Sequence, residues 1–319
     1  MEPELKDIPF FLVIISLLVL SSCSSFGYKD ELVGAYYNLG NAYSDLGNFE
    51  QSSAAFVRAL QIDPSFPSAS YNLGIVQIQS GNFSEGIDVL RDLLQKEPDN
   101  IIIMKVLAWG YYKNGELSKA IGVYEKILQI DFYNTDALNN ITILMVNLKM
   151  YEKAYPYLVQ LEAIGDVDSN LYYNIGITER ELGKSSGLEW FELAYEKDVN
   201  LEKNLFALIE ALTIEKDFER IVELYDVLIG INSDPELIFN KAFILLTAIE
   251  DYDLGIPALE SALKNGYKNT ERIEELKSYS DLLDRDKILS VFINYPPLDN
   301  IETNDEAGVI LIEDPEGQN

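Results

Sequence analysis

The residues able to do chemistry in this chain leave few routes to catalysis. None of the 319 residues is histidine, which excludes nucleophile triads with a histidine base and zinc sites with histidine ligands. Neither GxxxxGKS nor GxGxxG occurs, so the common phosphate-binding loops are absent. The 53 acidic residues are spread so widely that no carboxylate pair stands out as catalytic. We therefore expect a non-catalytic protein with no cofactor and no metal.

The single cysteine, Cys23, points to a different chemistry. It follows FFLVIISLLVL at 10–20, an apolar run shorter than the ~20 residues of a membrane-spanning helix and within the ~7–15 of a signal-peptide core. LSSC at 20–23 resembles a bacterial lipobox, in which Cys23 would carry a diacylglycerol lipid. We predict a signal peptide at 1–22, then the lipidated Cys and a short linker at 23–32. Because Lys6 is the only base of the leader, an ordinary secretory signal and a short uncleaved anchor remain alternatives.

A repeat of 34 residues organises the rest of the chain. Small or aliphatic residues recur at this spacing, with one step of 33: Leu39, Leu73, Leu107, Ile141, Ile175, Leu208 and Ala242. A fixed period of this size indicates a solenoid in which each supersecondary unit buries its apolar face against its neighbours.

Matching residues recur at matching offsets within the repeats. YNLG occurs at 37–40 and 71–74, and YNIG at 173–176. LGNF and SGNF end the first helix of two units, and ALQIDP ends a second helix with a proline. This pattern resembles the tetratricopeptide repeat (TPR) family. In the first unit its positions are held by Tyr36, Leu39, Gly40, Tyr43, Ser52, Phe56, Ala59 and Pro64.

The resemblance implies an all-α fold, a right-handed α-α superhelix of about seven TPR units. We place these units at residues 33–269, with small glycines such as Gly40, Gly74 and Gly176 letting paired helices approach closely. Two amphipathic segments at 270–295 are expected to cap the last unit.

The resemblance also implies where a partner binds, because the first helix of each TPR pair lines a concave groove. An asparagine amide pairs with an extended backbone, and aromatic faces supply contact area. An alternative is that the Tyr-Asn pairs hold adjacent units together. The candidate binding residues are Tyr37, Asn38, Asn41, Tyr71, Asn72, Lys105, Trp109, Tyr112, Lys113, Asn140, Asn174 and Arg180.

Charge limits the partners further. The formal net charge of −29 repels phosphate backbones and anionic lipid headgroups. Nucleic-acid binding is not expected, and membrane contact should come from the lipid on Cys23. Residues 296–319 hold acids but no Lys or Arg and predict a disordered acidic tail, with VILI at 309–312 as an isolated apolar patch or a docking strand.

These features predict a lipid-anchored, non-catalytic scaffold of the bacterial cell envelope, facing the periplasm, that binds a protein or peptide in the groove. Two alternatives stay open. One is an accessory lipoprotein of a periplasmic solute transporter that handles a small ligand in the superhelix channel. The other is an assembly factor for outer-membrane proteins.

Overall fold

The computed structural model describes residues 29–165, 168–279 and 284–295. The chain divides into two compact units, unit 1 at residues 1–167 and unit 2 at residues 168–319. The predicted signal peptide, Cys23 and the predicted acidic tail at 296–319 lie outside the described residues.

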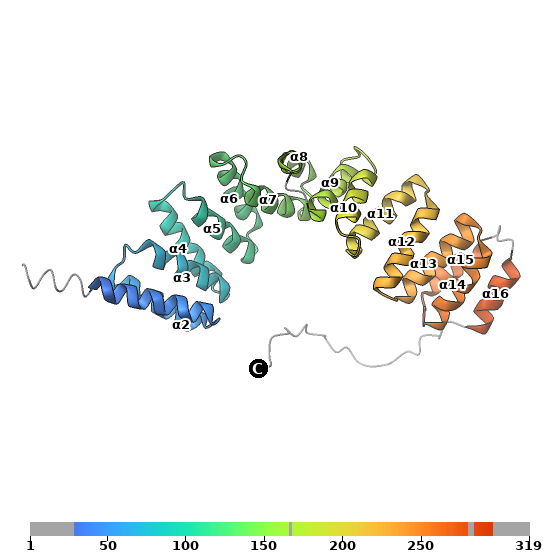
Figure 1. Cartoon of the computed structure of the whole chain (residues 1–319), viewed down its shortest axis with the longest axis horizontal. Coiled ribbons are helices and arrows are strands. Elements are labelled where there is room, and N and C mark those ends of the chain that lie inside the picture. Colours follow the sequence, from blue (N-terminus) through green and yellow to red (C-terminus); the bar gives the residue numbers. More distant parts are fainter. Residues whose placement is uncertain (1–28, 166–167, 280–283, 296–319) are drawn as a thin grey trace, which may run out of the picture. The chain divides into compact units, whose positions relative to one another are not determined.

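Unit 1 is built from helices joined by short turns (Figure 1). Residues 29–45 are helical. The helices that follow are α2 Phe49–Ile62, α3 Pro67–Gln79, α4 Phe83–Lys96, α5 Ile101–Lys113, α6 Leu117–Ile130, α7 Thr135–Asn147 and α8 Tyr151–Ile164.

Unit 2 continues with the same kind of element. Its helices are α9 Ser169–Glu181, α10 Leu188–Lys197, α11 Glu202–Glu215, α12 Phe218–Ile231, α13 Pro235–Ile244, the π-helix η1 Leu245–Ile249, α14 Tyr252–Lys264, α15 Thr270–Ser278 and α16 Arg285–Asn294.

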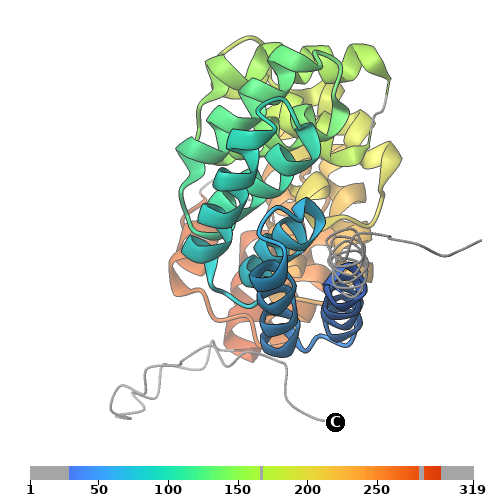
Figure 2. The same ribbon diagram turned by 90° about the vertical axis from the view of Figure 1, so that its left-hand side faces the viewer.

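From α2 to α8 in unit 1 and from α9 to α14 in unit 2, helices consecutive in the chain pack against each other (Figure 2). This confirms the prediction of an all-helical repeat fold. The described residues form seven successive pairs from 29–62 to 235–264, and α15 and α16 follow them. The periodic positions are buried from Leu73 to Ala242, whereas Leu39 is 43% exposed. Leu39 belongs to the first pair, which has no earlier pair beside it among the described residues.

Small residues set the distance between paired helices, as predicted. A Cβ at Gly74 of α3 would lie 2.6 Å from Cγ of Leu90 on α4. A Cβ at Gly40 would meet the ring of Phe56 at 2.5 Å. Leu90 and Phe56 are fully buried, so these glycines let the second helix place a large buried side chain against the backbone of the first.

The inner turn of each pair uses a left-handed residue. Glycine holds this position in several turns, but Lys149, Lys216 and Glu250 hold it in three others, with φ of 57°, 60° and 61°. Side chains with a Cβ are strained in this conformation. The fourth, sixth and seventh pairs therefore have the same turn geometry without the residue that adopts it most easily.

Among the described helices, none combines the length and the apolar character needed to cross a lipid bilayer.

Candidate functional site

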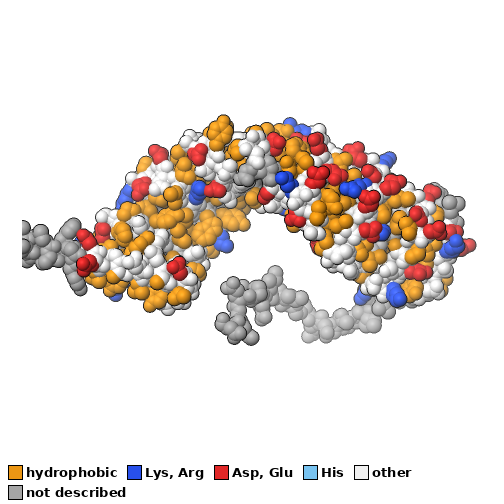
Figure 3. Space-filling view, in the orientation of Figure 1, with side chains coloured by type: hydrophobic (Ala, Val, Ile, Leu, Met, Phe, Trp, Pro, Cys, Tyr) orange, Lys and Arg blue, Asp and Glu red, His pale blue; other side chains and the backbone are white. Residues whose placement is uncertain are grey.

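Three of the four first helices in unit 1 are almost free of charge, whereas the helical residues 29–45 carry Lys29, Asp30, Glu31 and Asp45. Together α3, α5 and α7 carry only Lys105, Lys113 and Asp136, whereas the second helices α4, α6 and α8 carry 11 charged residues. In a chain with a net charge of −29, this contrast marks one side of unit 1 as distinct. We call the side formed by α3, α5 and α7 the first-helix face. Figure 3 shows broad hydrophobic areas over the helices of unit 1.

The corresponding helices of unit 2 differ. There α9, α11 and α13 carry six acids and three bases. Each of the bases is engaged: Arg180 Nη1 lies 2.6 Å from Oε2 of Glu210, Lys203 Nζ donates to Asn170 at 2.5 Å, and Lys241 pairs with Asp226. The predicted residues Asn174 and Arg180 are half-buried in this unit.

Two pockets flank Asn72 at the start of the first-helix face. One, of about 360 Å³, is lined by Tyr37, Tyr71 and Asn72 among others. The second, of about 410 Å³, is lined by Asn41, Asn72 and Ile75 among others. The structure therefore brings together four of the predicted residues, Tyr37, Asn41, Tyr71 and Asn72. The predicted residue Asn38 is exposed and lines neither pocket.

The amide of Asn72 links neighbouring repeats. Its Nδ2 donates to Oδ1 of Asn41 at 2.8 Å and to the hydroxyl of Tyr37 at 3.3 Å. Tyr37 in turn packs edge-on against Phe66, with ring centroids 5.1 Å apart. This arrangement agrees with the alternative in which the Tyr-Asn pairs hold units together. Because Asn72 lines both pockets, its polar side chain lies between them.

Three predicted residues share one side of α5. Trp109, Tyr112 and Lys113 are spaced three and four apart, so their side chains are neighbours on the helix. Trp109 is half-buried, Tyr112 is 51% exposed and Lys113 is exposed. An aromatic pair beside an ammonium offers apolar contact together with a cation for a carboxylate or a carbonyl oxygen.

Lys105 and Asn140 make polar contacts within the fold. Lys105 Nζ on α5 lies 2.5 Å from Oδ2 of Asp136 on α7, and Asn140 Nδ2 donates to the backbone oxygen of Asp136 at 2.7 Å. Burial raises the pKa of Tyr71, and the ammonium of Lys105 offsets part of that rise. The ion pair cancels the only acid of the face, which leaves Lys113 as its net charge.

The loop before α5 supplies residues that the sequence analysis missed. Asn100 accepts hydrogen bonds from the backbone N–H groups of Ile102 and Ile103 at 3.0 and 3.3 Å, and donates to Glu97 at 2.7 Å. All four residues line the pocket at Tyr71, and Ile102 is 64% exposed. The sequence signal for these residues is Asn100, a residue type that caps helices, directly before three isoleucines. It was missed because only positions beside the Leu-Gly pair were considered.

Two models of known protein families match parts of unit 1. Residues 40–81 match the model of a TPR repeat, and residues 74–136 match a second model described as a tetratricopeptide repeat. Residues 40–136 therefore carry tetratricopeptide repeats. These matches cover the α5 cluster and the lining of both pockets except Tyr37.

Two curated proteins are distantly similar. The type IV pilus assembly protein PilF of Pseudomonas aeruginosa is 26% identical over 204 residues, which is 62% of this chain and 67% of PilF. The protein O-mannosyl-transferase Tmtc3 of Drosophila melanogaster is 25% identical over 160 residues, which is 50% of this chain but 17% of that protein.

Solved structures share the fold. A tetratricopeptide repeat protein from Parabacteroides merdae superposes with a TM-score of 0.55 at 18% identity, covering 77% of this chain and 97% of that one. YrrB, described as a TPR protein with an unusual peptide-binding site, gives a TM-score of 0.50 at 19% identity, covering 58% of this chain and 96% of that one. At these identities the likeness concerns the fold alone.

Proposed function

We propose that this chain is a non-catalytic scaffold of the bacterial cell envelope whose first-helix face in unit 1 binds an extended segment of another protein. The observation that carries this proposal is the low charge of α3, α5 and α7 beside exposed aromatic and aliphatic side chains. Charged side chains are generally depleted at the core of a protein interface, while aromatic residues are enriched.

The geometry suits a chain rather than a compact ligand. The two pockets beside Asn72 are open and neighbouring, and the α5 cluster lies on the next first helix along. A segment that lies across α3 and α5 would place successive side chains in these pockets and against Trp109. Asn38 and Lys113 are exposed at the margin and are available for its backbone and for a carboxylate.

Placement in the envelope rests on two supports. The N-terminal sequence resembles a lipoprotein signal with Cys23 at the lipidation position. The similarity to a pilus assembly protein favours a partner from an envelope assembly, for which a type IV pilus is one candidate.

The experiment is affinity capture of the full-length protein after crosslinking in the cells that make it, followed by mass spectrometry. The test variant is Trp109→Ala with Tyr112→Ala. Phe206→Ala is the matched control, because Phe206 is a 41% exposed aromatic residue on a first helix of unit 2. We expect the double variant to lose a defined partner that the control retains. Retention by the double variant, or equal loss in both, would contradict the proposal.

Native mass spectrometry of the same preparation separates the proposal from the small-ligand alternative. A small molecule that co-purifies with the wild type and is lost from the double variant would favour transport of that molecule. Peptide capture by an otherwise empty protein would favour the scaffold.

A further inference from the structure

A separate apolar notch opens between the second helices α6 and α8 of unit 1. It has a volume of about 570 Å³, and its apolar lining comes from Phe132, Met145, Pro156, Tyr157, Val159 and Ala163. Val159 is 44% exposed although it lies on a helix whose core residues face α7. Apart from Met145, which is buried on α7, the residues that line the notch lie outside α3, α5 and α7.

The equivalent notch one repeat earlier shows what is unusual here. It lies between α4 and α6, measures about 360 Å³, and has Pro98 where the later notch has Phe132, 34 residues on. It is also lined by two bases, Arg91 and Lys126. The later notch is therefore larger, and it exchanges a proline for an aromatic residue.

Two exposed aromatic side chains, Phe132 and Tyr133, lie beside the larger notch. Phe132 and Tyr133 are 59% and 68% exposed, and their rings meet edge to face with centroids 5.1 Å apart. The loop that carries them is held at both ends. Gln160 Nε2 of α8 donates to the backbone oxygen of Phe132 at 2.6 Å, and the side chain of Asn134 accepts from the N–H of Ala137 at 3.1 Å. The exposed aromatic pair and the notch therefore lie side by side on one surface of unit 1.

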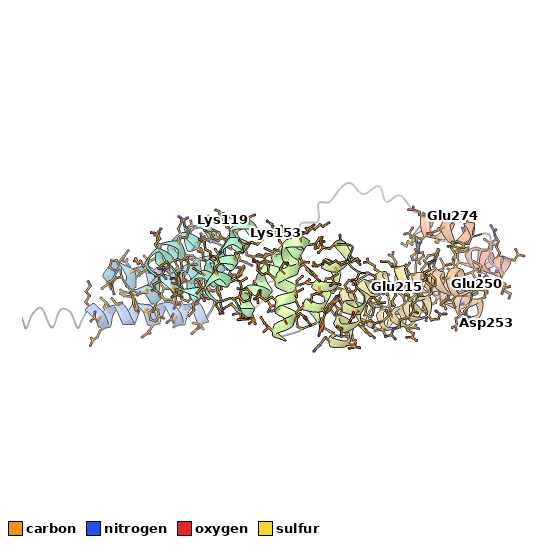
Figure 4. All side chains as sticks on the ribbon, turned by 90° about the horizontal axis from the view of Figure 1, so that it is seen from above. Lys119, Lys153, Glu215, Glu250, Asp253 and Glu274 are labelled. Carbon is orange, nitrogen blue, oxygen red and sulfur yellow. The ribbon has the colours of Figure 1, made fainter. Side chains whose placement is uncertain are left out.

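Charges of both signs frame the notch. Glu125 of α6 and Lys153 of α8 both line it, and neither forms a salt bridge with another residue in the described part of the chain. Figure 4 shows Lys153 along the same edge of unit 1 as Lys119, its equivalent one repeat earlier, which pairs with Glu116. In two copies related by a two-fold axis, such a surface presents its acid to the base of the other copy and its base to the acid of the other copy.

We propose that this notch is a self-association site, in which two copies of the chain meet about a two-fold axis. Tyr133 of each copy enters the notch of the other, the Phe132 rings pack across the axis, and Lys153 of each copy faces Glu125 of the other. An isologous contact requires the same patch to supply both the projecting and the receiving parts, which this surface does. The contact brings two first-helix faces into one assembly.

The contact is expected to be weak and reversible. Stable interfaces engage about 20–30 residues on each side. The exposed apolar residues here are Ile130, Phe132, Tyr133 and Val159. The net charge of −29 makes two copies of the chain repel each other outside the notch. Salt screens this repulsion, so added salt should strengthen the dimer.

The test is sedimentation equilibrium of the full-length protein in density-matched detergent over a range of concentrations. The variant is Phe132→Pro with Tyr133→Asp, which copies Pro98 and Asp99 of the preceding loop. Asp131 before it is already extended, with φ −129° and ψ 92°, which is the conformation favoured for a residue that precedes proline. We expect a concentration-dependent dimer and at least a tenfold higher dissociation constant for this variant. Tyr112→Ala, on the first-helix face, should leave the dimer unchanged.

Charge exchange gives a second readout that does not alter the loop. Glu125→Lys or Lys153→Glu alone should weaken the dimer several-fold, and the two together should restore it. A protein that stays monomeric at every concentration would overturn the proposal. So would a dimer that is unaffected by the loop variant and by both charge variants.

Discussion

The side-chain amide of Asn72 donates a hydrogen bond of 2.8 Å to Oδ1 of Asn41, which lies one repeat earlier in the chain. The bond crosses from α3 to the helical residues 29–45 and separates the two pockets of the first-helix face. An asparagine that the sequence offers as a ligand-binding residue is therefore also a structural link between repeats. Mutations at this position must be read with both roles in mind.

Removal of this link should cost stability. Asn72→Ala leaves the oxygen of Asn41 and the hydroxyl of Tyr37 without their shared donor, and we expect the free energy of unfolding of unit 1 to fall by about 1–2 kcal/mol. Asn38→Ala is the matched control, since Asn38 is exposed and has no recorded side-chain hydrogen bond within the described residues. Urea denaturation followed by circular dichroism measures both. Equal stability of the two variants would show that the Asn72 bond contributes nothing.

The close approach of α3 and α4 predicts a steric penalty. Gly74→Ala places a Cβ 2.6 Å from Cγ of Leu90, and overpacking of this kind costs about 1–3 kcal/mol. Gly122→Ala on α6 adds a Cβ that meets no atom within 4 Å. It should stabilise the helix by about 0.5–1 kcal/mol. Thermal unfolding should move in opposite directions for the two variants, and a shift of the same sign in both would refute the packing argument.

The strained turns predict a gain in stability. Lys216 adopts φ of 60°, a conformation that costs a residue with a Cβ about 1–2 kcal/mol. Lys216→Gly removes that strain but adds about 0.4–1 kcal/mol of unfolded-state entropy, which leaves a net gain of roughly 0.5–1 kcal/mol. Lys126→Gly, within helix α6, should instead lose about 1 kcal/mol. The midpoint of thermal unfolding reports both changes, and a lower midpoint for Lys216→Gly would contradict the assignment of strain.

Alkaline pH should weaken unit 2 through Tyr267. Burial raises the pKa of its hydroxyl to about 12, with a smaller contribution from the carboxylate of Glu236. A raised pKa in the folded state means that the stabilisation is complete below the unfolded pKa of about 10 and is lost as pH rises through 12. At pH 11 the loss should be about 1 kcal/mol. Tyr267→Phe has no such proton to lose, so denaturation at pH 8 and pH 11 should show a smaller decline than in the wild type. An equal decline would exclude Tyr267 as a source.

The repeat register was predictable because it rests on local requirements. Gly40, Gly74 and Gly176 stand where two helices touch, and a side chain there would collide with Phe56, Leu90 or Phe191. The three glycines lie 34 and 102 residues apart, so the sequence carries this close approach at multiples of the 34-residue period. The division of the chain at residues 167 and 168 has no such periodic signature, and the sequence analysis did not foresee it.

The candidate site was only partly predictable, because its shape depends on contacts between repeats. The positions beside the Leu-Gly pair pointed to Tyr71 and Asn72, which do line pockets. The capping loop at Asn100 closes one pocket from the next repeat, and this depends on how α4 and α5 pack. The notch beside Phe132 likewise depends on the separation of α6 and α8. The sequence shows that Phe132 stands where the preceding repeat has Pro98, but this difference does not give that separation.

The most direct test of the first-helix face is photo-crosslinking from single positions of the full-length protein in its own cells. The photoreactive residue p-benzoylphenylalanine is placed at position 112, on α5, or at position 51, an exposed glutamine on the second helix α2. The proposed function predicts a discrete adduct with a partner protein from position 112 and none from position 51. An adduct from position 51 alone, or no adduct from position 112, would contradict the binding of a partner on the first-helix face.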